Sequence, residues 1–216
     1  MRQAPDMASD KERRKPRADS LRNRERLLVT ARDVFSAGGP DASLEGVARA
    51  AGVGIGTLYR HFPTREALFQ AVYKREVDQL VDLATSLAAE QSPLEALRRW
   101  LHGFIGMVAT KKGMLAALAP AAGSSSELYA DSTARLTRSI KDLMAKAVAA
   151  GQIRDDIAPE DAMRAVIGIC YAPEQAGWQG TVVRLVDVFV DGLRLRPAEP
   201  ARGSTSRTST SRKSKG

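Results

Sequence analysis

A turn containing two glycines constrains the fold of this chain more than any other feature. Gly52-Val53-Gly54 separates two stretches that each have the apolar spacing of a helix. We expect Gly52 to end the first helix with a left-handed backbone conformation, and Ser43 to cap its start. Because the turn is so short, the second helix must cross the first at a steep angle. Residues 43–62 are therefore predicted to form a helix-turn-helix.

The second helix of this motif is predicted to have one apolar and one polar face. Leu58 and Phe62 are expected to point into a core. The opposite face carries hydroxyl, guanidinium and imidazole groups, which belong to Thr57, Tyr59, Arg60 and His61. A short helix with such hydrogen-bonding groups on its outer face suits the major groove of DNA.

The segment from Arg24 to Val72 contains the runs LEGVARAAGV, GTLYRHF and PTREALF. It resembles the DNA-binding domain of the TetR family of bacterial transcriptional regulators, and the resemblance covers the N-terminal third of the chain. It implies an all-α homodimer with an N-terminal three-helix helix-turn-helix domain and a C-terminal helical effector-binding and dimerisation domain. The partners that it implies are a double-stranded DNA operator and a small-molecule effector of unknown identity.

The resemblance also implies which residues contact DNA. The expected phosphate or sugar contacts are Ser43, Thr57, Tyr59, His61 and Arg65, and the residues expected near base edges are Ile55, Gly56 and Tyr59. Arg60 shares the outward face. Ile55 departs from the family pattern, because many relatives have a polar or basic residue there. Apolar contact with a thymine methyl group is the mode that isoleucine permits.

The composition indicates the class of protein and the cellular compartment to expect. A chain of 216 residues with 44% hydrophobic content can form a packed core. The single cysteine, Cys170, permits no intramolecular disulfide and no thiol cluster for a metal, so we expect a cytoplasmic protein. The sequence shows neither a signal peptide nor an apolar run of membrane-spanning length, and no membrane association is expected.

The net charge of +8 lies at the two ends of the chain. Residues 1–26 carry nine Lys or Arg against five Asp or Glu, and residues 197–216 carry five against one. We predict a disordered basic arm over residues 1–20 and a disordered basic tail over residues 197–216. The arm would either contact DNA phosphates or only increase solubility.

The expected domains are the helix-turn-helix domain, residues 21–66, and the ligand-binding and dimerisation domain, residues 67–196. Nine helices are predicted in all. They are residues 21–37, the two helices of the motif, and stretches at about 64–87, 94–110, 113–120, 127–150, from 159 onward, and 181–195.

The helix predicted over residues 181–195 indicates a dimer. Its polar residues form one narrow stripe, Arg184, Asp187, Asp191 and Arg194, and apolar residues cover the remaining circumference. A helix of this kind is buried on two sides. Pairing with the preceding helix and with a second chain would bury both sides, and a central core helix of a monomer is the alternative.

Aromatic residues and one methionine are the candidates for an effector site. They are Trp100, Phe104, Met107, Tyr129, Tyr171 and Trp178. Such side chains suit a mostly apolar pocket, and they suit an ordinary core equally well.

An enzyme is the main alternative from another class. Gly52, Gly54 and Gly56 form a G-x-G-x-G run, but no strand precedes it as a phosphate-binding loop requires. His61 and His102 would have to combine with distant partners to form a catalytic set. We therefore expect no catalysis, no cofactor and no bound metal. A non-specific architectural DNA-binding protein is the other alternative, but it does not account for a C-terminal domain large enough to hold an effector.

Overall fold

The computed structural model describes residues 7–38, 42–118, 126–171 and 178–195. Within these ranges the chain forms eight helices, and its only β-pairing is an isolated antiparallel bridge between Ile153 and Arg194. The predicted all-α fold, with a helix-turn-helix at the N-terminal end and a helical C-terminal part, is confirmed.

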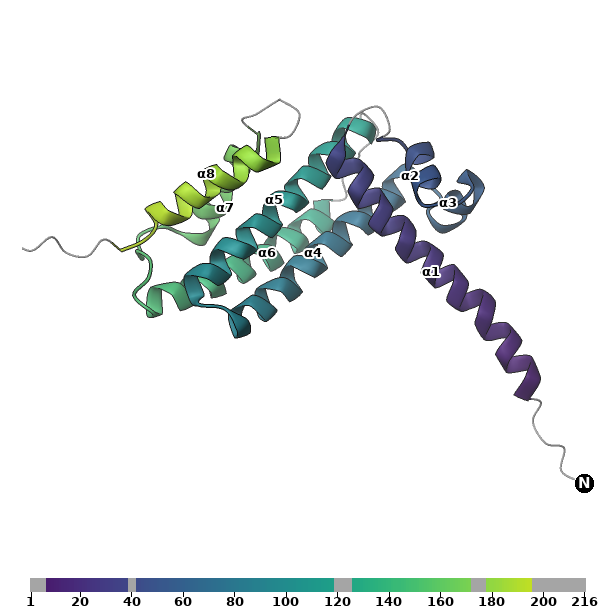
Figure 1. Cartoon of the computed structure of the whole chain (residues 1–216), viewed down its shortest axis with the longest axis horizontal. Helices are drawn as coiled ribbons and strands as arrows, with labels where there is room; N and C mark the ends of the chain where they lie inside the picture. The colour runs from purple at the N-terminus through teal and green to yellow at the C-terminus, as the bar shows by residue number, and fades with distance from the viewer. Residues whose placement is uncertain (1–6, 39–41, 119–125, 172–177, 196–216) are drawn as a thin grey trace, which may run out of the picture.

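The first three helices lie together at one end of the molecule (Figure 1). They are α1 (Met7–Ala37), α2 (Leu44–Ala50) and α3 (Ile55–His61). The C-terminal half of α1 packs with α2 and α3 around fully buried apolar side chains, which include Leu27, Phe35, Val47 and Leu58. We call α2, α3 and the C-terminal half of α1 the reading head.

The remaining helices form a bundle that we call the body. They are α4 (Arg65–Glu90), α5 (Pro93–Leu118), α6 (Ser126–Ala149), α7 (Pro159–Tyr171) and α8 (Trp178–Gly192). The central helix is α5, which contacts α1, α4, α6, α7 and α8. It therefore joins the reading head to every other part of the body.

The helix α5 corrects the prediction of two separate helices over residues 94–110 and 113–120. It runs without a break to Leu118, and Gly113 lies inside it. Glycine at this position allows close packing, because a Cβ at Gly113 would lie 1.7 Å from the carbonyl oxygen of Phe35 in α1. The glycine that the sequence suggests as a helix start is thus the point where α5 crosses the end of α1.

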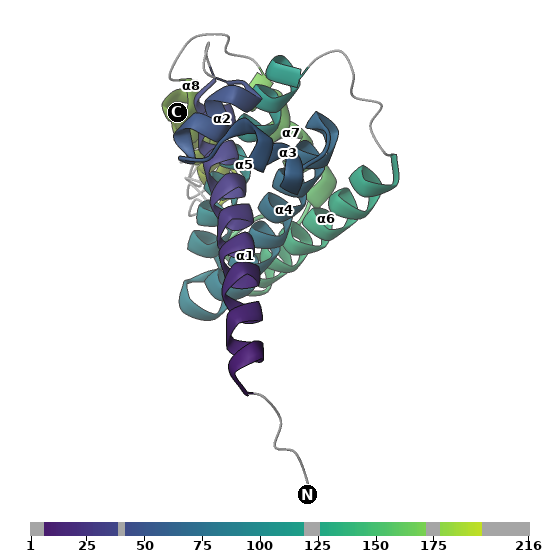
Figure 2. The same cartoon turned by 90° about the vertical axis from the view of Figure 1, so that its right-hand side faces the viewer.

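The helix α1 corrects the prediction of a disordered arm over residues 1–20. The helix begins at Met7 rather than near residue 21, and residues 1–6 lie outside the described residues. Its N-terminal part extends away from the rest of the molecule (Figure 1 and Figure 2). This segment lacks an apolar period, so the pattern gave no helix signal. Acidic residues spaced three or four positions before basic ones favour an exposed helix instead.

Candidate DNA-binding surface and ligand grooves

The turn of the helix-turn-helix is fixed by local hydrogen bonds. Ser43 Oγ accepts a hydrogen bond from the Gly46 amide at 3.0 Å, as predicted for a helix cap. Gly52 has φ +64°, and its amide donates to the Arg49 carbonyl at 3.1 Å. The Val53 amide donates to the Ala48 carbonyl at 3.0 Å, which completes a Schellman motif. These bonds set the direction in which α3 leaves the turn.

The helix α3 presents the polar face that the sequence predicts. Leu58 and Phe62 are buried in the core of the reading head. Ile55 is 39% exposed and Tyr59 is 41% exposed. The other candidate contacts on this helix are the exposed Gly56 and Arg60 and the half-buried Thr57 and His61. The exposed residues, Ile55, Gly56, Tyr59 and Arg60, lie on one side of this short helix, which a single groove could receive.

Residues next to α3 extend this surface. Arg65 is exposed at the start of α4, where Thr64 Oγ1 accepts a hydrogen bond from the Ala67 amide at 3.0 Å. From α1, the Arg24 guanidinium lies 5.2 Å from the centre of the Phe62 ring. In the sequence, Arg24 stands out only as part of the basic N-terminal end. The contact with Phe62 adds a positive charge beside the C-terminal end of α3.

Three of the six candidate effector residues belong to the core. Trp100, Phe104 and Met107 are buried, and the rings of Trp100 and Phe104 stack with centroids 5.6 Å apart. Trp100 Nε1 donates to the Leu80 carbonyl at 2.9 Å. Tyr129 lies in α6, but its side chain lies outside the described residues.

Tyr171 and Trp178, the last two candidates, lie around one lysine. Lys112 Nζ is 4.9 Å from the Tyr171 ring centroid and 4.5 Å from that of Trp178. It also donates to the Cys170 carbonyl at 2.9 Å. The cysteine itself is fully buried, and burial raises the pKa of its thiol to about 11. At neutral pH this thiol is protonated and therefore a poor nucleophile.

The end of α1 is held by the body at two points. One is the close approach of Gly113 to the Phe35 carbonyl. The other is a hydrogen bond of 3.2 Å from Gln179 Nε2 in α8 to the Ser36 carbonyl. We call this pair of contacts the α1 joint. It connects the reading head to the helices of the body that carry most of the candidate effector residues.

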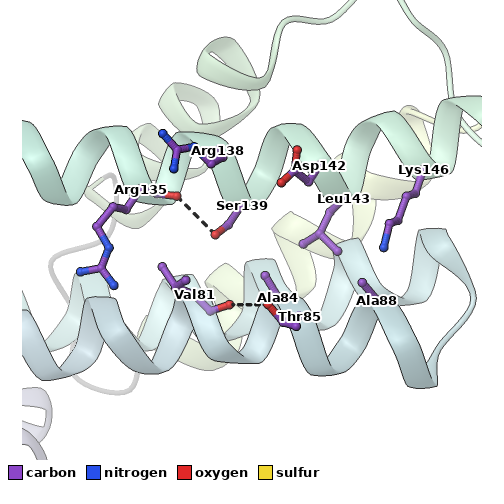
Figure 3. A pocket seen from close by; sticks show the side chains of 10 residues that line it. All are labelled: Val81, Ala84, Thr85, Ala88, Arg135, Arg138, Ser139, Asp142, Leu143 and Lys146. Carbon is purple, nitrogen blue, oxygen red and sulfur yellow. Dashed lines mark hydrogen bonds between the residues drawn. The ribbon is translucent and has the colours of Figure 1, made fainter.

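A surface groove runs between α4 and α6 (Figure 3). It has a volume of about 290 Å³ and an apolar floor that includes Val81, Ala84 and Leu143. Its charged lining consists of Arg135, Arg138, Asp142 and Lys146. Arg135 is already paired with Asp78 of α4 at 2.8 Å. The groove is basic, and it contains none of the residues that sequence analysis proposed for an effector.

A second groove, of about 380 Å³, lies where α1, α4 and α5 meet. We call it the junction groove. Its lining consists of Arg32, Asp33, Ser36, Glu76, Gln79, Leu80, Leu83, Gly103, Gly106 and Thr110. Neither groove could be predicted from the sequence, because helices distant in the sequence contribute their walls and no local spacing reveals the convergence.

The carboxylate of Glu76 is the most unusual group in the junction groove. The residue is 9% exposed, and its Oε1 has no hydrogen-bond partner within the described part of the chain. Arg75 Nη1 lies 4.0 Å from Oε1, but the Arg75 guanidinium bonds to Glu25 at 2.7–2.8 Å. Burial raises the pKa of Glu76, although the positive charges of Arg32 and Arg75 oppose this shift.

The outer face of α7 and α8 is apolar and exposed. Val182, Val186 and Val190 point into the body. Large apolar side chains of these two helices are nevertheless 37–69% exposed, and they are Ile167, Tyr171, Leu185 and Val188. An apolar face of this kind is typical of a surface that pairs with another chain.

Two acids of the predicted polar stripe turn toward the body. Asp187 accepts hydrogen bonds from Arg98 at 2.8 Å and from His102 at 2.9 Å. Asp191 accepts from the same arginine. Burial alone would raise the pKa of Asp187, but the bonds from Arg98 and His102 keep it below its ordinary value. The stripe therefore attaches α8 to α5.

The described ranges contain neither a metal-binding cluster nor a membrane-spanning helix. Among these residues, no group of three or more His, Cys, Asp or Glu side chains could hold a metal ion. None of the described helices combines the length and the apolarity that crossing a membrane requires.

Comparison with known proteins agrees with this geometry. The family model described as bacterial regulatory proteins of the tetR family matches residues 27–72. A second model, described as the C-terminal domain of SbtR-like transcriptional regulators, matches residues 92–195. The first covers the reading head and the start of α4, and the second covers most of the body.

Two solved structures are similar over nearly their whole length. A TetR transcriptional regulator from Streptomyces coelicolor is 44% identical, with a TM-score of 0.69 over 79% of this chain and 98% of that one. A TetR transcription regulatory protein from Mycobacterium vanbaalenii is 34% identical, with a TM-score of 0.64 over 83% of this chain and 99% of that one.

Similarity to curated proteins is confined to a shorter region. An HTH-type transcriptional regulator of Staphylococcus aureus is 34% identical over 85 residues, which are 38% of this chain and 44% of that protein. The regulator UidR of Escherichia coli is 36% identical over 75 residues, 34% of this chain and 35% of UidR. The chain thus matches less than half the length of these relatives.

The reading head and its exposed α3 face define a helix-turn-helix DNA-binding regulator of transcription. The matches extend from this domain through the body. The chain belongs to the TetR family of bacterial transcriptional regulators.

Proposed function

We propose that this chain is a homodimeric repressor that a small-molecule effector releases from its operator. The observation that carries the proposal is the arrangement of α3, where Leu58 and Phe62 anchor the helix while Tyr59, Arg60 and Ile55 remain exposed. A helix fixed by its inner face can present its outer face to the major groove without further ordering. Binding to chromosomal DNA would place the protein in the cytoplasm.

The assignments of individual DNA contacts are part of this proposal. Tyr59, Ile55 and Gly56 would approach base edges. The proposed phosphate or sugar contacts are Ser43, Thr57, His61 and Arg65, with Arg60 on the same surface. The hydroxyl of Ser43 already accepts one hydrogen bond as a helix cap, and it can still donate its own proton to a phosphate oxygen.

A dimer would bring two reading heads to one operator. The exposed apolar side chains of α7 and α8, with Val188 at 69% exposure, supply a surface that a second copy would cover. Two half-sites roughly one helical turn apart would then double the DNA contacts. This symmetry is what makes a small recognition helix specific.

Release by an effector requires that ligand binding and DNA binding favour different arrangements of the reading heads. The α1 joint supports such coupling, because Gly113 and Gln179 of the body contact the last turn of α1. An effector that changes the packing of α5 or α8 would move the reading head. By linkage, operator DNA must then weaken effector binding by the same factor.

Selection of DNA fragments from a random pool by the purified protein tests the proposal. We expect a palindromic operator, and gel-shift titration with it should show that Tyr59→Ala reduces affinity by about 1–3 kcal/mol. Tyr59 is exposed, so the thermal stability of the variant should match the wild type.

Tyr59→Phe is the matched control, because it keeps the ring and removes only the hydroxyl. An intermediate loss would assign part of the effect to a hydrogen bond. If the folded Tyr59→Ala protein binds the operator as the wild type does, α3 is not the reading helix. Equal affinity for selected and random DNA would favour the architectural alternative.

A further inference from the structure

The junction groove is open because α5 has glycine where it faces α1 and α4. At Gly103 an added Cβ would contact Leu83 Cδ2 at 3.0 Å and Leu80 Cδ2 at 3.1 Å, so the floor there is already closed. At Gly106 an added Cβ would meet nothing within 4 Å. The empty volume therefore lies beside Gly106, with the leucines as its apolar wall.

Glu76 places an incompletely satisfied carboxylate in this groove. Its side chain is 10% exposed, and its Oε1 accepts no hydrogen bond from any described residue. A buried carboxylate ordinarily accepts several hydrogen bonds, since burial removes the water that would otherwise supply them. This carboxylate therefore has unused capacity for donors.

The neighbouring arginines make their hydrogen bonds to other acids, and the nearest approach to Glu76 is that of Arg75 Nη1, 4.0 Å from Oε1. Arg32 donates to Asp33 from Nε at 2.9 Å and from Nη2 at 2.6 Å. Arg75 bonds to Glu25 through Nε at 2.8 Å. The charged residues of the lining are Arg32, Asp33 and Glu76, which leaves the groove with a formal charge of −1 when all are ionised. A cation would balance this charge.

We propose that the junction groove binds a small organic ammonium ion, whose N–H groups donate to the Glu76 carboxylate and whose apolar body lies against Leu80 and Leu83. The volume of about 380 Å³ falls within the range of small-molecule sites. A charge-assisted hydrogen bond to a largely buried carboxylate is stronger than a neutral one, which favours an amine over an alcohol of the same shape.

The position of the groove gives this ligand a regulatory role, and this step rests on the proposed function. One wall comes from Arg32, Asp33 and Ser36 of α1, and the others come from α4 and α5. Ser36 is also the residue whose carbonyl accepts the bond from Gln179 in the α1 joint. A ligand in the groove would contact both the reading head and the body, and would favour one angle between them.

Isothermal titration calorimetry of the full chain at pH 7 tests the binding site. The probes are 2-phenylethylammonium and, as an uncharged analogue of similar shape, 2-phenylethanol. We expect the amine to bind about tenfold or more tightly than the alcohol. Equal affinity for the two probes, or no binding of the amine at millimolar concentration, would overturn the proposal.

Two variants locate the bound amine. Glu76→Gln should weaken amine binding by about tenfold or more, with little effect on the alcohol. Gly106→Leu should weaken the binding of both probes, because the leucine side chain would fill the open volume without a clash at Cβ. Asp142→Asn, in the groove between α4 and α6, is the matched control and should bind the amine as the wild type does. If the Glu76→Gln protein binds the amine with wild-type affinity, the proposed site is wrong.

Operator binding in the same preparations separates this proposal from the proposed function. An amine that binds through Glu76 and lowers operator affinity supports both. If the wild-type protein binds its operator but not the amine, the proposed amine site in the junction groove is wrong. The proposed function as a DNA-binding regulator then still stands. Amine binding that depends on Glu76 but leaves operator affinity unchanged supports the site and contradicts its regulatory coupling.

Discussion

Two glycines of α5, seven residues apart, have opposite surroundings. A Cβ at Gly113 would lie 1.7 Å from the Phe35 carbonyl oxygen and 2.6 Å from its carbon, so any side chain there forces α5 and α1 apart. A Cβ at Gly106 meets no atom within 4 Å. Glycine is therefore needed for packing at one position, and at the other it leaves the junction groove open.

Gly113→Ala should destabilise the protein by about 1–3 kcal/mol or more, because backbone atoms must shift to admit the methyl group. Urea unfolding followed by circular dichroism measures this change. Gly106→Ala in the same helix is the control, and it should stabilise by about 0.5–1 kcal/mol through improved helix propensity. If both variants are equally stable, the close approach of α5 to α1 is not a constraint.

Glu76→Gln should stabilise the protein at pH 7 by about 1–2 kcal/mol, since it removes an incompletely paired buried charge. Burial raises the pKa of Glu76 above its ordinary value of 4.5, so the folded state binds the proton more tightly than the unfolded state. The wild type therefore loses stability as the pH rises through the folded-state pKa, and the glutamine variant does not.

Urea unfolding at a series of pH values should show this difference shrinking as the pH falls toward 4. Asp82→Asn, an exposed acid on the same helix, is the control and should change stability by less than about 0.5 kcal/mol. A Glu76→Gln protein that is less stable than the wild type at pH 7 would show that the carboxylate is favourably paired.

At the scale of single helices, the sequence predicted the reading head well because its signals are local. The cap at Ser43, the left-handed Gly52 and the buried Leu58 follow from spacing within a few residues of each. The length of α5 could not be predicted in this way. Lys111, Lys112 and Gly113 resemble a helix end, and only the position of α1 explains why glycine is there.

The same limit applies to the candidate ligand sites. Aromatic content directed the prediction to Trp100 and Phe104, which the structure places in the core. The junction groove depends on Arg32, Glu76 and Gly106, from three helices spread over more than seventy residues of sequence. Their meeting is a property of tertiary packing, so spacing alone could not reveal it.

At the scale of the whole molecule, one chain leaves an apolar face uncovered on α7 and α8. Val188→Glu should convert a dimer into monomers, because it places a charge in the proposed interface. Val188 is 69% exposed within a single chain, so the fold of the monomer should survive. Size-exclusion chromatography with light scattering at micromolar concentration measures the mass.

Ala145→Glu, at an exposed position of α6, is the matched control and should remain a dimer. If the wild-type protein is a monomer, the proposed homodimer is wrong. A Val188→Glu protein that stays dimeric would move the interface to another surface. In either case the proposal of paired half-sites would have to be revised.

The α1 joint contains no charged group. The Phe35 carbonyl approaches the Cα of Gly113, and a neutral amide of Gln179 donates to the Ser36 carbonyl. Ionic strength screens interactions between charges and leaves neutral contacts of this kind nearly unchanged. Phosphate contacts weaken steeply as salt rises. The part of the connection between body and reading head that runs through the α1 joint should therefore persist at salt concentrations that already abolish DNA binding.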